Sequence, residues 1–363
     1  MSGEVLLLRE KIGIAIISYA FEHAYQCTEA LIEVPDACIP IIWDDYKERG
    51  KAAAKKYNLL YSNSLDYVLQ VPEVKGVIIS SETSKHLELI KKAAEAGKAI
   101  LCQKPLAHTL KECDQIIEII DKTGVPFSLA FQMRYDPVRK KVKELLDLGV
   151  VGKISALRCR HGGPWMLDKE YMSYPFRSWL FDPKCTPGMF MWEGIHVADF
   201  MLWILGEPVS VTAQIGNIVT DIGYDDTGLA VYRFKNGKMG IHFSSAVMLA
   251  AENSLEIYGD KGVIIQNYGD TSSTEIYRDE RAVALKMYST DFEEKKWKEF
   301  DFSSEVSQLN RKKAPAYAFL DYIKGKDNNP ITAREGRKSV EMILGAYKSN
   351  REERTIYFPL KDN

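Results

Sequence analysis

The sequence predicts an α/β protein with two parts: an N-terminal, doubly wound parallel sheet, and a C-terminal α+β domain with a large, mostly antiparallel open sheet. Three observations predict this fold class. The chain has 363 residues, too many for one ordinary core, and so indicates about two domains. Short β-branched runs alternate with helical stretches in the first third. Later strands instead follow one another with turns between them.

The first domain is predicted to span residues 1–133 and to consist of βαβ units. Its apolar runs are separated by segments in which apolar residues recur every three or four positions, the period of a helix. This order is typical of a nucleotide-binding domain of the Rossmann type. The predicted strands are Lys11–Ile17, Ala37–Trp43, Val74–Ser80, Ala99–Cys102 and Val125–Phe131, and the predicted helices are His23–Glu33, Lys47–Tyr57, Ser84–Ala96 and Leu110–Thr123.

The second domain is predicted to span residues 134–363. Asn236-Gly237 is a hairpin-type turn between two alternating strands. The last helix follows a capping-like Thr332, and it is a candidate to pack back on the first domain. The predicted strands are Gly152–Arg160, Val211–Gly216, Gly228–Phe234, Lys238–Ala246, Ser254–Gly259, Gly262–Gln266 and Thr274–Tyr277, and the predicted helices are Lys140–Leu148, Gly188–Leu205 and Ala333–Ser349.

Charge and cysteine usage exclude several classes of partner. The 48 basic and 50 acidic side chains leave a net charge of -2, which argues against a nucleic-acid partner. The apolar run Ile12–Ala20 is short and interrupted, so we expect neither a membrane span nor secretion. The 6 cysteines show no CxxC and no Cys/His pairing. We therefore expect free thiols, a cytoplasmic location and no metal site.

The first strand leads into a turn with the layout of a dinucleotide-binding loop but without its glycines. Ser18, Ala20 and His23 stand where GxGxxG would fall, with Tyr19 between the first two. An ordinary βα turn is the alternative. The second predicted strand ends before Asp44, where a ribose-binding carboxylate is expected. Such a carboxylate repels a 2'-phosphate, so NAD is predicted as the cofactor in preference to NADP, although the nearby Lys47 and Arg49 soften that choice.

The most informative segment is AAEAGKAILCQKPLA, residues 93–107, in which a helix and a strand lead to Lys104. It resembles the AGKHVLCEKPLA signature of the glucose-fructose oxidoreductase, inositol dehydrogenase and rhizopine-catabolism (Gfo/Idh/MocA) family. The resemblance implies that Lys104 touches the reacting hydroxyl and the nicotinamide ribose. Gln103 replaces the family's glutamate. A surface lysine that ends a strand is the alternative interpretation of Lys104.

Further segments follow the same family in order along the chain. Residues 77–86 resemble its VIATPNxxH turn, which implies that Ser81, Glu82 and His86, like Gln103, lie at the cofactor. Arg134 resembles the start of its RxxP exit from the nucleotide domain and is implied to face substrate.

A second cluster lies in GMFMWEGIHVAD, residues 188–199, which resembles the family's GGxxxDxGxHxxD helix. The resemblance implies that His196 contacts substrate, with Asp199 one turn later as an orienter of the imidazole or as a helix contact. Trp192 replaces the catalytic aspartate. Glu193 follows it, about 100° round a helix, so its reach into the site stays open.

Several large aromatic side chains precede this helix. Trp165, Tyr174 and Trp179, together with Trp192, are predicted to form a platform for a sugar ring or an aromatic aglycone. Core packing and subunit contacts are the alternative for about half of such rings. Apolar alternation on the uncovered face of the second sheet predicts a homo-oligomer through that sheet.

The predicted activity is hydride transfer between a secondary hydroxyl of a sugar, polyol or glycoside and NAD. His196 is assigned as general base, Lys104 as electrostatic stabiliser and proton relay, and Glu193 or Asp199 as orienter. The alternatives are an enzyme that retains NAD for transient oxidation in an elimination or isomerisation, and a non-catalytic NAD-binding regulator. The sugar itself is not identified by the sequence.

Overall fold

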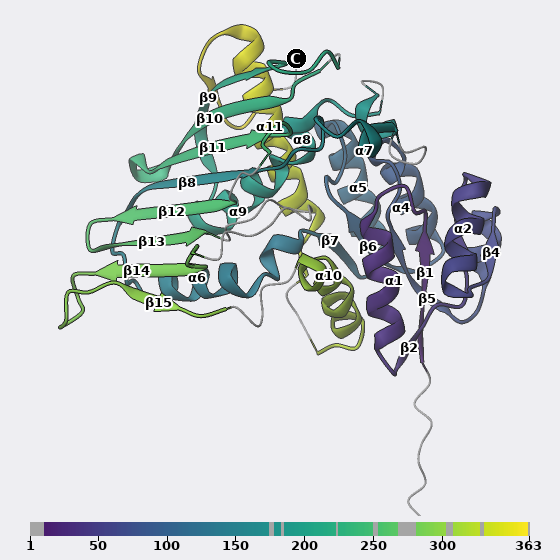
Figure 1. The fold of residues 1–363 in the computed structure, drawn as a ribbon. Coiled ribbons are helices and arrows are strands. Elements are labelled where there is room, and N and C mark those ends of the chain that lie inside the picture. Colours follow the sequence, from purple (N-terminus) through teal and green to yellow (C-terminus); the bar gives the residue numbers. More distant parts are fainter. Residues whose placement is uncertain are drawn as a thin grey trace, which may run out of the picture.

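The computed structural model describes residues 11–173, 178–182, 185–222, 224–249, 253–267, 281–302, 308–326 and 330–361. Two sheets dominate it, and they lie side by side in Figure 1. One is parallel and belongs to the first third of the chain, and the other is mixed and mostly antiparallel. The predicted fold class is confirmed.

The parallel sheet has seven strands in the order β4-β3-β1-β5-β6-β7, with the short β2 also paired to β1. The predicted strand Ala37–Trp43 is interrupted, because Pro40 has no N–H to donate to a neighbouring strand. The short β4 and α3 were not predicted. The strands are β1 Ile12–Ile17, β2 Ala37–Cys38, β3 Ile42–Trp43, β4 Tyr61–Ser62, β5 Val74–Ile79, β6 Ala99–Gln103 and β7 Phe127–Ala130, and the helices are α1 His23–Glu33, α2 Lys47–Tyr57, α3 Leu65–Gln70, α4 His86–Glu95 and α5 Leu110–Thr123.

The strand order reverses direction at β1, since β3 lies on one side of it and β5 on the other. In open α/β sheets, ligands bind beyond the carboxyl ends of the strands at such a switch point. Three predicted site residues come directly after strand ends at this edge: Ser18 after β1, Asp44 after β3 and Lys104 after β6.

The second sheet has nine strands in the order β15-β14-β13-β12-β8-β11-β10-β9-β16. Only β8 and β11 pair in parallel. Asn236 and Gly237 adopt φ 65° and 80° in the turn between β10 and β11, as the predicted hairpin requires. The predicted strand Thr274–Tyr277 lies outside the described residues, and β14, β15 and β16 were not predicted. The strands are β8 Ile154–Gly162, β9 Pro208–Gly216, β10 Thr227–Phe234, β11 Met239–Ser245, β12 Ser254–Gly259, β13 Gly262–Asn267, β14 Leu285–Ser289, β15 Lys298–Phe300 and β16 Ile356–Tyr357.

The predicted helix Gly188–Leu205 is two helices, α8 and α9, separated at Glu193 and Gly194. A Cβ at Gly194 would lie 2.3 Å from the Phe190 carbonyl oxygen, so this turn requires glycine. The break changes the direction in which Glu193 projects. The helices of this half are α6 Pro137–Asp147, α7 Lys169–Ser173, α8 Met189–Trp192, α9 Ile195–Leu205, α10 Gln308–Ile323 and α11 Ala333–Glu352.

Two late helices hold the halves together (Figure 1). Helix α11 begins with a capping box of Thr332 and Glu335 and packs on α5, where Arg337 binds Asp114. Helix α10 packs on α1. Among the described helices, none combines the length and apolar character that a membrane crossing needs.

Candidate functional site

Lys104 reaches from the first half of the chain into the second. Its side chain is 1% exposed, and Nζ donates a hydrogen bond to the Trp192 carbonyl oxygen at 2.9 Å. The rings of Trp192 and Phe21 lie 4.5 and 5.1 Å from Nζ. Burial lowers the pKa of Lys104 to about 8, since a buried ammonium loses its hydration.

His86 supports the loop that follows Lys104. Its Nδ1 lies 3.1 Å from the Pro105 carbonyl oxygen and 3.2 Å from that of Leu106. The imidazole is fully buried, and burial lowers its pKa, which favours a neutral ring that donates to these carbonyls. His86 therefore positions Lys104 through the loop backbone.

Glu193 lies between Lys104 and two histidines. Its Oε1 is 3.9 Å from Lys104 Nζ, and its Oε2 is 3.0 Å from His161 Nε2. The rings of His161 and His196 have centroids 5.2 Å apart. The break between α8 and α9 thus brings Glu193 into the group. We call Lys104, His161, Glu193 and His196 the Lys104 cluster.

Burial sets the charge of both histidines in the Lys104 cluster. It lowers the pKa of His161 and of His196, and Lys104 lowers both further by charge repulsion. Nδ1 of His196 is buried and has no hydrogen-bond partner. A neutral imidazole with a free nitrogen is equipped to accept a proton.

His161 was not predicted as a site residue. It lies on β8, which alternates buried and exposed side chains, and its sequence neighbours give no sign of a site. Only the pairing of β8 with β11 and β12 places it beneath α9.

Asp199 and Arg134 bind each other. Arg134 Nε and Nη2 both donate to the Asp199 carboxylate, at 3.0 and 2.6 Å, and Nη1 donates to Glu335 at 2.6 Å. The expected contact of Asp199 with the His196 imidazole is not among the hydrogen bonds of the described residues. This ion pair joins α9 to the loop after β7, and it leaves Glu193 as the carboxylate of the Lys104 cluster.

The turn after β1 keeps the conformation that a glycine would have. Ser18 has φ 71°, which is rare for a residue with a Cβ, and its Oγ accepts from the Ala20 N–H at 3.2 Å. The Tyr19 N–H donates to Asp44 at 2.8 Å. The loop is thus held against the end of β3, as in a dinucleotide-binding turn.

Arg49 covers the Asp44 carboxylate. Its Nε and Nη2 lie 2.8 Å from the two Asp44 oxygens, and Nη2 lies 3.1 Å from Ser18 Oγ. Arg49 also bonds Glu82 at 3.3 Å and Asp45 at 3.2 Å. Lys85 pairs with Asp45 at 2.5 Å and with Glu82 at 3.0 Å. We call Asp44, Asp45, Arg49, Glu82 and Lys85 the Arg49 cluster.

His23 stands where the signature of the resembled family has its last glycine, and Gln103 stands where that family has a glutamate. The two side chains lie close together. Burial lowers the pKa of His23 well below its usual value, and the nearby Gln103 side chain offsets this in part. Oε1 of Gln103 is buried without a partner. Ser81 is also buried nearby, after β5.

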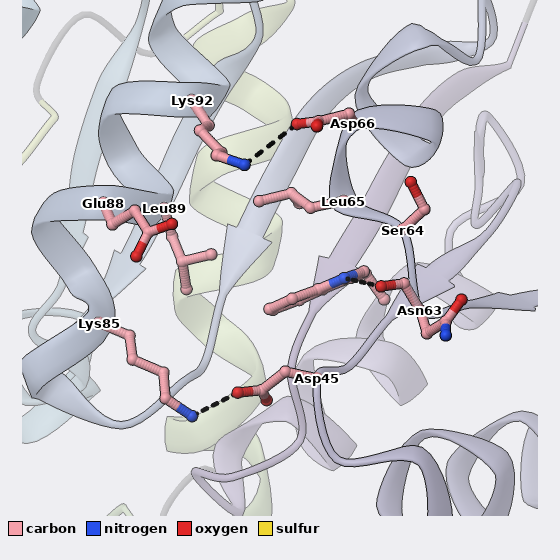
Figure 2. Close-up of a pocket in the computed structure, with 10 residues that line it drawn as sticks. Asp45, Asn63, Ser64, Leu65, Asp66, Lys85, Glu88, Leu89 and Lys92 are labelled. Carbon is pink, nitrogen blue, oxygen red and sulfur yellow. Dashed lines mark hydrogen bonds and ion pairs between the residues drawn. The ribbon is translucent and has the colours of Figure 1, made fainter.

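A pocket of about 410 Å³ opens beside the Arg49 cluster, between α3 and α4. Figure 2 shows Leu65 and Leu89 facing each other across it, with the Lys85–Asp45 ion pair at one end and the Lys92–Asp66 pair at the other. Trp43 also lines it, and its indole N–H donates to the Asn63 carbonyl oxygen at 3.2 Å. Trp43, Leu65 and Leu89 are the apolar side chains of an otherwise polar lining, and they offer contact surface for a flat heterocycle.

Three of the four predicted aromatic platform residues share one buried cluster with Phe21. The rings of Trp165 and Trp192 meet edge to face at 5.7 Å, and Trp179 Nε1 donates to the Ala20 carbonyl oxygen at 3.2 Å. The indole nitrogens of Trp165 and Trp192 are buried without partners. Tyr174 lies outside the described residues.

Comparison with protein families finds two matching models. The model of an oxidoreductase family with an NAD-binding Rossmann fold matches residues 12–131, and the model of the GFO/IDH/MocA C-terminal domain matches residues 140–265. The first model covers the whole parallel sheet, and the second covers β8 to β12 and most of β13 in the second sheet.

Individual relatives agree with these models. The myo-inositol 2-dehydrogenase of Thermotoga maritima is 26% identical over 337 residues, 90% of this chain and 93% of its own. A levoglucosan dehydrogenase of Pseudarthrobacter phenanthrenivorans is 25% identical over 63% of this chain and 64% of its own. The solved structure of a levoglucosan dehydrogenase with NADH and levoglucosan superposes with a TM-score of 0.83 at 19% identity, covering 97% of this chain and 100% of that one. That structure shows the shared fold.

Proposed function

Because the chain belongs to the GFO/IDH/MocA oxidoreductase family, we propose that it transfers hydride between NAD and a secondary hydroxyl of a sugar or glycoside. The observation that carries the proposal is the meeting of Lys104 with Glu193. A buried lysine from the nucleotide-binding half and a buried carboxylate from the other half come together at the sheet edge where such folds bind ligands.

The residues after β1 and β3 suit NAD. The left-handed turn at Ser18 brings backbone N–H groups and the start of α1 to the place of a pyrophosphate. The pocket in Figure 2 takes the adenine, and Asp44 takes the ribose hydroxyls. Arg49 must release Asp44 for this contact. When bound, NAD supplies the hydride acceptor.

Two groups of the Lys104 cluster handle the hydroxyl. With NAD bound as the hydride acceptor, oxidation of the hydroxyl would break its O–H bond and the neighbouring C–H bond, form a C=O bond and release one proton. Lys104 stabilises the negative charge that develops on the oxygen. His196 accepts the proton, and Glu193, paired with His161, orients the site in place of the aspartate lost at Trp192.

The aromatic cluster favours a glycoside with an aromatic group over a small polyol. The indole N–H groups of Trp165 and Trp192 are buried without partners, and they are donors for the oxygens of a sugar. Arg134 contributes by holding α9 in place rather than through a free guanidinium, because its donors bind Asp199 and Glu335.

The second sheet supplies the surface of a homo-oligomer. Leu229, Val231 and Met239 project from neighbouring strands β10 and β11, and each is at least 37% exposed. Apolar side chains at such spacing favour burial against another copy. All six cysteines are free thiols, which suits a reducing cytoplasm.

The test is to incubate the chain with NAD and a panel of sugars and glycosides, and to measure the NADH formed by its near-ultraviolet absorbance. Steady NADH release with one of them supports the dehydrogenase. Sugar conversion without NADH release, with NAD found by mass spectrometry in the purified protein, supports the retained-cofactor alternative instead. The catalytic proposal fails if Lys104→Ala and His196→Ala both leave sugar conversion intact.

A further inference from the structure

The end of helix α8 carries both the hydrogen-bond partner and the ion-pair partner that Lys104 has among the described residues. The Trp192 carbonyl oxygen, which accepts from Lys104 Nζ at 2.9 Å, belongs to the last residue of α8, and Glu193 follows it directly. Oε1 of Glu193 lies 3.9 Å from Lys104 Nζ. A displacement of α8 would therefore change the surroundings of the Lys104 ammonium.

Helix α8 is too short to hold itself in place. It has 4 residues, and one isolated turn is unstable, because it fixes many dihedral angles for few hydrogen bonds. Its first N–H groups have no partner inside the helix. Gly188, the residue before α8, has no side chain that could accept from them. The support of α8 must therefore come from other elements.

Asp225 and Tyr347 supply the missing acceptors. Asp225 precedes β10, and its Oδ2 accepts from the Phe190 N–H at 2.6 Å. The Tyr347 hydroxyl, from α11, accepts from the Met191 N–H at 3.1 Å and donates to Asp225 Oδ1 at 2.8 Å. Burial raises the pKa of Tyr347 well above its usual value, so the hydroxyl keeps the proton that it donates. The two side chains thus tie the first turn of α8 to α11 and to the segment before β10.

The close approach of the chain at Gly188 fits this pair. Gly188 has φ 148°, and a Cβ there would lie 1.8 Å from Asp225 Oδ1 and 2.7 Å from the Tyr347 hydroxyl oxygen. A side chain at this position would displace both acceptors from α8. Asp225 is 8% exposed, which leaves little room for water to take over its hydrogen bonds.

We propose that Asp225 and Tyr347 are positioning residues, which hold α8 so that its end keeps Lys104 in place for the reacting hydroxyl. This inference rests on the role of Lys104 in the proposed function. One helical turn transmits the effect, because the Trp192 N–H donates to the Gly188 carbonyl oxygen at 3.2 Å. A shift of about 1 Å at a catalytic group can lower a rate by about 100-fold.

The first experiment measures the reactivity of Lys104 in the full chain, without NAD or sugar. Brief acetylation with acetic anhydride is quantified by mass spectrometry, and the rate at Lys104 is divided by the rate at Lys98, which precedes the same strand. In the wild type, the buried Lys104 should react slowly. Tyr347→Phe and Asp225→Asn should each raise this ratio about tenfold, because the loss of one hydrogen bond shifts a local opening equilibrium by about that factor.

Two matched control variants separate this role from a general loss of stability. Tyr232→Phe removes a hydroxyl that also bonds α11, through the Met342 carbonyl oxygen at 3.1 Å. Asp226→Asn changes the neighbouring buried carboxylate, which accepts from the N–H groups of residues 218 to 220. Within the described part of the chain, neither side chain forms a hydrogen bond to α8, so both controls should leave the ratio within about twofold of the wild type.

Kinetics give the second readout. With a sugar that the chain oxidises, Tyr347→Phe and Asp225→Asn should each lower kcat about tenfold and leave the dissociation constant of NAD within about twofold. The proposal is overturned if neither variant raises the Lys104 ratio, if the controls raise it equally, or if kcat stays unchanged. If no sugar is oxidised, acetylation alone decides whether this pair positions Lys104, and only the proposed function fails.

Discussion

The Arg49 cluster and the Lys104 cluster lie at the same edge of the parallel sheet, but their charged side chains are paired to very different degrees. In the first, two cations bind three carboxylates through five ion pairs of 2.5 to 3.3 Å. In the second, Lys104 has one carboxylate among the described residues within 4 Å, at 3.9 Å, and two histidines that burial keeps neutral.

The two clusters therefore suit different roles: one holds a cofactor in place, and the other transfers a proton. Paired charges hold their side chains in place and resist titration, which suits the recognition of a cofactor. Lys104 and His196 have shifted pKa values, and His196 has a nitrogen without a hydrogen-bond partner, which suits proton transfer. Four predictions test the comparison, in order of decreasing effect.

The largest effect is expected in the Lys104 cluster. Lys104→Ala and His196→Ala should each lower kcat for sugar oxidation by about 10² to 10⁴-fold, because each removes a group that acts on the reacting hydroxyl. Lys98→Ala is the matched control: Lys98 precedes the same strand at its opposite end and donates to the Val74 carbonyl oxygen. Equal activity of all three variants would end the distinction between the clusters.

Asp225, which holds α8 beside the Lys104 cluster, should make the stability of the fold depend on pH. Asp225 accepts hydrogen bonds from the Phe190 N–H in α8 and from the Tyr347 hydroxyl, and burial raises its pKa from 3.8 to about 6. A raised pKa means that folding favours the protonated acid, so its stabilisation is complete below pH 4 and is lost as the pH rises through 6.

Asp225→Asn removes this titration. The free energy of unfolding of the wild type, minus that of the variant, should therefore fall by about 2 kcal/mol between pH 4 and pH 7. Denaturant unfolding of both proteins across this range measures it. A difference that stays constant with pH would show that Asp225 does not titrate in the folded chain.

A smaller effect is expected in the Arg49 cluster. Asp44→Ala should reduce the preference for NAD over NADP by about tenfold in the ratio of dissociation constants, since it removes one ribose contact and one negative charge. Calorimetry with both cofactors measures it, and the more exposed neighbour Asp45→Ala is the control. Tighter binding of NADP than NAD by the wild type would contradict the assignment of Asp44.

The smallest effect concerns substrate choice. Trp192→Asp should restore the family's aspartate and weaken a stacking contact worth about 0.5 to 1.5 kcal/mol, shifting kcat/KM by a few-fold from aromatic glucosides toward inositol. Kinetics on both substrates measure the ratio. An unchanged ratio would remove the reason for assigning Trp192 to substrate.

The contrast also marks what the sequence was able to predict. Lys104, Ser18 and Asp44 each follow a strand directly, so a contiguous motif located them. His161 gives no local signal, because its position depends on the pairing of strands far apart in the chain. Glu193 depended on a helix break that Gly194 causes, and Arg49 on ion pairs with residues of two separate loops. The sequence predicted the fold class and the motif residues, and tertiary packing decided the rest.

The central claim, hydride transfer from a sugar ring hydroxyl to NAD at Lys104, is tested most directly by mixing the wild-type chain with NAD and an aryl glucoside. The account predicts NADH in equal amount to a ring ketone, with a higher kcat/KM than for inositol or free glucose. No NADH and no ketone from any sugar or glycoside, by a chain that binds NAD, would contradict it.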